Sequence, residues 1–156
     1  MFWAITAFAL VTFAVLWLWI RSRLAPTSYY FDPQDTYFDN NQSLKLPLSA
    51  RTATFEPMLK HYVGVTQLLV TVAAASIAFG GNNHPIRSVG IAKVLLAWSI
   101  FYGVVFCAML IWRYDEYAQD SESYTRNWYA AVRASGFSTI ICFMLGYFTW
   151  GWGLLK

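Results

Sequence analysis

Charged side chains are scarce in this sequence, and long stretches contain none. Lys, Arg, Asp and Glu make up 12% of the 156 residues, whereas an ordinary soluble domain has about 25%. Hydrophobic residues reach 58% and aromatic residues 19%, so the chain lacks the polar surface that a soluble protein needs. The composition predicts one small membrane domain. The net charge of +3 is too small to indicate nucleic-acid binding by itself.

Cysteine, histidine and the usual catalytic or metal motifs are also nearly missing. The two cysteines, Cys107 and Cys142, lie in apolar runs, which excludes a disulfide framework and predicts buried thiols. His61 and His84 fall on opposite sides of the membrane in the topology given below, so they cannot share a metal ion within one subunit. No phosphate-binding glycine loop, zinc spacing or nucleophile–base pair is visible. We therefore expect no cofactor, no metal, no catalytic residue and no enzyme.

What the chain does contain is four apolar stretches of membrane-spanning length. Residues 1–20 carry neither charge nor proline, and Arg21 and Arg23 follow at once. At about 1.5 Å per residue, such a run matches a hydrocarbon core of about 30 Å. The other three lie within residues 62–79, 88–112 and 128–155. The pattern predicts an all-α membrane protein with four transmembrane helices, divided into 1–23, 24–61 and a three-helix bundle over 62–156.

Two polar segments separate these spans and are predicted to form a small cytoplasmic cap. Residues 22–60 contain Pro26, Pro33, Pro47 and Pro57, which predict short extended pieces and turns. Residues 113–134 form the second segment, and the charges of its first part suggest a short helical extension beyond the membrane.

The distribution of basic residues predicts the orientation. The side that holds both polar segments carries eight basic residues and the opposite side carries three. The eight are Arg21, Arg23, Lys45, Arg51, Lys60, Arg113, Arg126 and Arg133, and the three are Arg87, Lys93 and Lys156. Because cytoplasmic loops are enriched in Lys and Arg, segment 21–61 is predicted to be cytoplasmic and both termini to lie outside. We expect an integral protein of a bacterial inner membrane.

The first span carries a stripe of mostly small apolar residues that ends in an arginine. Its members, at steps of three and four, are Ala4, Ala7, Val11, Ala14, Leu18 and Arg21. One interpretation is a helix-packing seam within the subunit. The other is that these six residues line the pore of a homo-oligomer, with a ring of Arg21 side chains that favours anions. Arg21 and Arg23 are equally explained as interface anchors.

Three more small faces are visible. In the second span, Gln67, Thr71, Ala74 and Ala78 share a face that we expect to be buried among other helices. Gly103 and Cys107 form a small strip in the third span. The fourth span has a predicted packing stripe made of Ser135, Thr139, Cys142, Gly146, Thr149 and Gly153. Gln67 is the most polar side chain at membrane depth, and the absence of intramembrane charge argues against a proton-coupled transporter.

The cytoplasmic segment has interleaved aromatic and basic residues that suggest a ligand site. The candidates are Tyr29, Tyr30, Tyr37, Phe38, Lys45 and Arg51. Aromatic rings stack on bases and cations contact phosphates, so a nucleotide or oligonucleotide signal is one candidate ligand. The alternative is a structured cap whose aromatic residues pack at the membrane interface.

The layout of one N-terminal span, a polar segment and a tight two-span hairpin is familiar. In the hairpin, LLVTVAAASIAFGG leads to VLLAWSIFYGVVFCAMLIWRYDEYAQD. This layout resembles the small membrane effectors of bacterial anti-phage defence, nearest to the channel effector of Hailong-type systems. The resemblance implies a homo-oligomeric, nucleotide-controlled ion channel that arrests or kills the infected cell, and it transfers no functional residue.

The leading expectation is thus a homo-oligomeric channel or pore-forming effector in the lipid bilayer. It would be gated at the cap by a nucleotide signal or a cytoplasmic regulator protein. A non-catalytic accessory subunit of a larger membrane complex is the alternative. A third class, an enzyme acting on lipid, would require a pocket that joins His61 or the acidic cap residues to the membrane interface.

Overall fold

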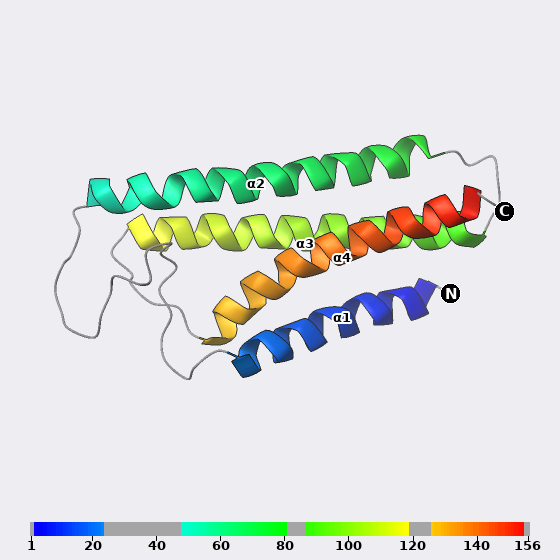
Figure 1. Cartoon of the computed structure of the whole chain (residues 1–156), viewed down its shortest axis with the longest axis horizontal. Helices are drawn as coiled ribbons and strands as arrows, with labels where there is room; N and C mark the ends of the chain where they lie inside the picture. Colours follow the sequence, from blue (N-terminus) through cyan, green and yellow to red (C-terminus); the bar gives the residue numbers. More distant parts are fainter. Residues whose placement is uncertain (1, 24–47, 81–86, 119–125, 155–156) are drawn as a thin grey trace.

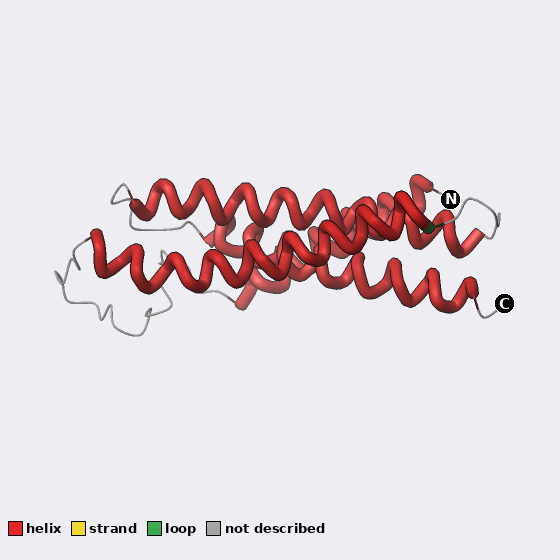
Figure 2. The backbone as a smooth tube through the Cα atoms, turned by 90° about the horizontal axis from the view of Figure 1, so that it is seen from above, coloured by secondary structure: helices red, strands yellow, loops and turns green. Residues whose placement is uncertain are grey.

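The computed structural model describes residues 2–23, 48–80, 87–118 and 126–154, with side chains for 2–23, 59–80, 88–112 and 127–153. All of these residues except Gly80 are helical (Figure 2). The helices are α1 (Phe2–Arg23), α2 (Leu48–Phe79), α3 (Arg87–Ala118) and α4 (Arg126–Leu154). Each contains a stretch long and apolar enough to cross a membrane. The all-α fold with four such helices is therefore confirmed.

Two helices extend further into the polar segments than their apolar runs. The prediction that residues 22–60 form only extended pieces and turns is wrong for 48–60, which belong to α2. Proline inside a helix removes one backbone hydrogen bond, and here the helix continues through Pro57. The preceding residues include Ala50, Arg51, Ala53 and Glu56, which favour helix. The predicted extension of α3 beyond Trp112 is present and reaches Ala118, and α4 already begins at Arg126.

About half of the predicted cytoplasmic cap falls outside the described residues. What is described of it is helical: residues 48–60 continue α2, residues 113–118 continue α3, and residues 126–134 belong to α4. These three pieces lie at the same end of the bundle (Figure 1).

The helices form an open array rather than a closed bundle (Figure 1). In the described part of the chain, α3 and α4 pack most extensively, α2 packs mainly on α3, and α1 packs on α4 and α3. No contact joins α1 to α2 within those residues. As a result, only 11% of the membrane-spanning window of either α1 or α2 is buried, against 39% for α3 and α4. The two edge helices each leave one side open.

The seam between α3 and α4 is built from the small stripe predicted in the fourth span. Ser135, Thr139, Cys142 and Gly146 are buried there, which confirms that prediction. Ser99 of α3 donates a hydrogen bond to the carbonyl oxygen of Thr139 at 2.9 Å. An added Cβ at Gly146 would lie 2.9 Å from Leu96, so glycine is what allows the two backbones to approach.

The predicted small strip of α3 is confirmed at Gly103, where three helices meet. Gly103 is buried, and a Cβ there would contact Val70 and Thr66 of α2 and Thr139 of α4. Absence of a side chain at this one position therefore sets the distance between α2 and α3.

Aromatic side chains attach α1 to the rest of the protein. Tyr102 of α3 donates its hydroxyl to the Ala9 carbonyl oxygen at 3.0 Å, and its ring stacks on Phe13 with centroids 5.6 Å apart. Near the other end of α1, the indole nitrogen of Trp17 donates to the Asn127 carbonyl oxygen at 3.1 Å. Two buried clusters, around Ala9 and around Ile20, lie at these two anchors. The α1 seam thus combines the fully buried Ala9 with the bulky residues Phe13, Trp17 and Ile20.

The starts and ends of the helices agree with an even number of spans. The first residue of α1 and the last of α4 lie at one end of the array, and the α1 C-terminus lies at the other (Figure 1). Which end faces the cytoplasm remains a prediction from the basic residues.

Candidate functional site

The predicted pore-lining stripe of α1 lies on the side of that helix that faces away from the other helices. Ala4, Ala7, Val11, Ala14 and Leu18 are all exposed. Because α1 packs through Ala9, Phe13, Trp17 and Ile20, the interpretation of the stripe as a packing seam within the subunit is wrong. The pore interpretation is left as a prediction, and the face itself is almost wholly apolar.

Arg21 lies at the margin of this stripe and not on its outward centre. Its guanidinium carbon is 5.2 Å from the centroid of the Trp17 ring, and Trp17 is itself hydrogen-bonded to α4. The side chain is half-buried. A cation–π contact with a docked tryptophan holds the charge next to α4.

The predicted ligand site of the cap lies outside the described residues. Tyr29, Tyr30, Tyr37, Phe38 and Lys45 fall in 24–47, and Arg51 lies in α2 without a described side chain. This prediction therefore stays a prediction.

The outer face of α2 carries the most distinctive side chain at membrane depth. Gln67 and Thr71 are exposed there, together with Ala74 and Ala78, so the described helices of this chain do not bury the face that was predicted to be buried among other helices. The reason is that α2 uses its other side, through Thr66, Val70 and Ala73, to pack on α3. Gly64 extends the open face, with nothing within 4 Å of an added Cβ. Small residues on both sides of α2 had made the two faces look alike.

Gln67 has no hydrogen-bond partner within the described part of the chain. It lies eight residues beyond Leu59, where the α2 span begins, which places it about 12 Å along the helix. A glutamine side chain is too short to reach the membrane surface from there. An amide without a partner in hydrocarbon costs about 4–8 kcal/mol on an alkane transfer scale. The Gln67 amide therefore needs water or another polar group as its hydrogen-bond partner.

A crevice separates α2 from α4 on the same half of the molecule as the α1 C-terminus. Its volume is about 510 Å³, and the ring of Phe106 from α3 forms its floor. His61 of α2 and Arg133 of α4 stand among its lining residues, both exposed. No signal in the sequence predicted this crevice, because it arises from the way α4 diverges from α2 at this end (Figure 1).

The two threonine hydroxyl groups that line the crevice are already hydrogen-bonded to their own helices. Thr66 donates to the Tyr62 carbonyl oxygen at 2.8 Å, and Thr139 donates to the Ser135 carbonyl oxygen at 2.9 Å. The walls therefore offer mainly hydrocarbon. An enzyme acting on lipid would require a pocket that reaches His61, and this crevice does reach it. Its two threonine hydroxyls, however, already donate to backbone carbonyl oxygens.

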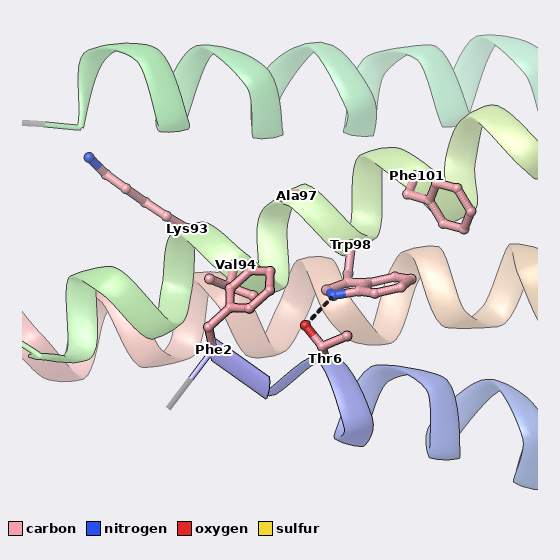
Figure 3. A pocket seen from close by; sticks show the side chains of 7 residues that line it. All are labelled: Phe2, Thr6, Lys93, Val94, Ala97, Trp98 and Phe101. Atoms are coloured by element: carbon pink, nitrogen blue, oxygen red, sulfur yellow. Dashed lines mark hydrogen bonds between the residues drawn. The ribbon is translucent and has the colours of Figure 1, made fainter. Parts of the chain in front are cut away.

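A second groove, of about 370 Å³, lies between α1 and α3 at the opposite end (Figure 3). Phe2, Val94, Trp98 and Phe101 line it, and the Trp98 indole nitrogen donates to the Thr6 hydroxyl at 3.4 Å. Figure 3 shows Lys93 extending away from Phe2, Thr6 and Trp98. The groove is an apolar surface with its polar atoms already paired.

Comparison with protein-family models, with curated proteins and with solved structures finds no match to this chain. Among the described residues, no three His, Cys, Asp or Glu side chains are grouped so that they could hold a metal ion. The functional argument accordingly depends on the faces of α1 and α2 and on the crevice.

Proposed function

We propose that this chain is the subunit of a homo-oligomeric membrane channel in which the outer face of α2 lines the path. The observation that carries the proposal is the Gln67 amide, exposed near the middle of a membrane span without a partner in the described chain. In a ring of parallel copies around an axis normal to the membrane, the Gln67 side chains meet at one level. Each amide then finds water or the amide of a neighbour.

The composition of the α2 face supports a path for water and ions. From the inner end, its members at steps of four and three are Lys60, Gly64, Gln67, Thr71, Ala74 and Ala78, all of them exposed. Small side chains leave room near the axis, and the amide and hydroxyl groups can bind water. A ring of Gln67 is neutral, whereas a ring of Lys60 at the inner end favours anions, so weak anion selectivity is expected for the wild type.

The α1 stripe is the rival path within the same function. Its exposed residues are apolar, and the Thr12 hydroxyl nearby donates to the Phe8 carbonyl oxygen at 2.9 Å. Such a face is as stable against lipid as against another helix. Only the α2 face carries a polar group that lipid cannot satisfy, and for that reason we favour α2.

The uninterrupted length of α2 supports gating of the channel from the N-terminal end of that helix. The helix runs from the proposed pore line back to Leu48 without interruption. A signal bound before residue 48 would therefore act directly on the pore helix. We propose that this end lies in the cytoplasm of a bacterial cell and that a nucleotide or a regulator protein acts there. The resemblance to Hailong-type effectors suggests anti-phage defence as the setting.

The experiment is planar-bilayer conductance of the purified chain, comparing wild type with Gln67→Glu and Arg21→Glu. A ring of carboxylates at position 67 should make the channel select cations, whereas Arg21→Glu should leave selectivity unchanged. A shift with Arg21→Glu alone would move the path to α1. Conductance whose selectivity neither Gln67→Glu nor Arg21→Glu changes would contradict both paths.

A further inference from the structure

The crevice between α2 and α4 is independent of the proposed channel, and its two ends differ in chemistry. At the mouth stand the imidazole of His61 and the guanidinium of Arg133. Deeper in, the walls are Val65 and Leu69 on α2 and Phe137 and Ile140 on α4, above the Phe106 ring. The charge is concentrated at one end and the hydrocarbon surface extends from it.

The length of the crevice matches one membrane leaflet. From His61 to Leu69 is eight residues of α2, or about 12 Å of helix. One leaflet contributes half of the hydrocarbon core of about 30 Å. His61 lies two residues after the start of the α2 span at Leu59, close to the level where lipid headgroups begin. Arg133 lies six residues after the start of the α4 span at Asn127, and its long side chain can extend back toward that level. A molecule lying in the crevice would therefore have its polar group at the interface and its apolar part within the leaflet.

Arg133 is arranged to bind an anion at this mouth. Its guanidinium carbon lies 4.9 Å from the centroid of the Tyr129 ring, which fixes the side chain through a cation–π contact. The planar fork of an arginine pairs well with phosphate oxygens.

We propose that this crevice binds one anionic phospholipid, with the phosphate at Arg133 and His61 and an acyl chain along Val65, Leu69 and Ile140. Charge complementarity at the mouth selects an anionic headgroup, and the hydrocarbon walls select a chain rather than a free phosphate. The bound lipid would fill the gap between α2 and α4, which contact each other little.

The test is native mass spectrometry of the detergent-solubilised chain, titrated with phosphatidylglycerol or with phosphatidylcholine that has the same acyl chains. The wild type should bind phosphatidylglycerol more tightly. Arg133→Gln should weaken that binding about tenfold, which equals about 1.4 kcal/mol. Ile140→Trp should block the crevice and lower the affinity for both lipids. Ile140 is exposed, so the variant should fold.

Two matched controls keep the test specific. Arg23 also stacks on an aromatic ring four residues earlier, Trp19, at 5.9 Å, but lies outside the crevice. Ile111 is an exposed isoleucine on α3 that does not line it. Arg23→Gln and Ile111→Trp should bind phosphatidylglycerol like the wild type. Equal affinity for the two lipids, or an equal loss with Arg23→Gln, would overturn the proposal.

Discussion

Gly103 offers a sharp test of how the helices are held together. A Cβ built there would lie 2.7 Å from Val70 Cγ2, 3.2 Å from Thr66 Cγ2 and 3.4 Å from Thr139 Cγ2. All three neighbours are β-branched and therefore stiff about χ1, so rotation of a side chain cannot relieve the clash. Gly103→Ala should force α2 or α4 away from α3.

The expected size follows from two opposing effects. Adding a methyl group to a close-packed seam costs about 1–3 kcal/mol. Replacing glycine by alanine inside a helix gains about 0.5–1 kcal/mol. Gly103→Ala should therefore destabilise the folded chain by up to about 2.5 kcal/mol.

The matched control is Gly151→Ala, because Gly151 is also helical but has nothing within 4 Å of an added Cβ. It should leave stability unchanged or raise it by up to about 1 kcal/mol. The assay is unfolding in mixed micelles with increasing sodium dodecyl sulfate, followed by circular dichroism. If Gly103→Ala is as stable as Gly151→Ala, the packing of α2 on α3 is not as described.

Two further predictions use the same unfolding assay, and a third uses hydrogen exchange. Ser138 and Ser99 are both fully buried, but Ser138 has no hydrogen-bond partner whereas Ser99 donates to the Thr139 carbonyl oxygen. Ser138→Ala should therefore stabilise the chain, and Ser99→Ala should destabilise it by about 1 kcal/mol. The opposite order of stabilities would refute these hydrogen-bond assignments. Tyr102→Phe keeps the ring stacked on Phe13 but loses the hydrogen bond to the Ala9 carbonyl oxygen, so it should lower the free energy of unfolding by about 1 kcal/mol. An unchanged unfolding midpoint would show that this bond does not hold α1 on α3. Trp17→Phe loses the hydrogen bond to the Asn127 carbonyl oxygen. It should raise the rate of hydrogen exchange in the last turns of α1 without affecting α2, because α1 and α2 do not contact each other in the described chain. Equal changes in both helices would contradict the open array.

The sequence predicted the packing face of α4 because one face of the fourth span differs from the rest, but it did not indicate that α3 would be the partner helix. Ser135, Thr139, Cys142 and Gly146 follow steps of four, three and four among bulky neighbours, and small residues allow close helix contact. The lengths of the four apolar runs predicted the number of spans in the same direct way.

The faces of the edge helices could not be chosen from the sequence. α1 is apolar all round, so nothing distinguished the packing side with Phe13 and Trp17 from the outward side with Ala7 and Val11. α2 has small residues on both sides, and only its contact with Gly103 selects the side with Thr66 and Val70. The crevice depends on the crossing of α4 over α3, which is a property of the tertiary arrangement.

The central claim is that copies of this chain meet along the α2 face, and cysteine cross-linking in membrane vesicles tests it most directly. Gln67→Cys and Val11→Cys would be compared in a background without Cys107 and Cys142, using mild oxidation and a short thiol-reactive linker. Both positions are exposed in the single chain. The account predicts efficient formation of cross-linked dimers for Gln67→Cys and little for Val11→Cys. Efficient cross-linking at Val11 with none at Gln67 would contradict it and return the subunit contact to α1.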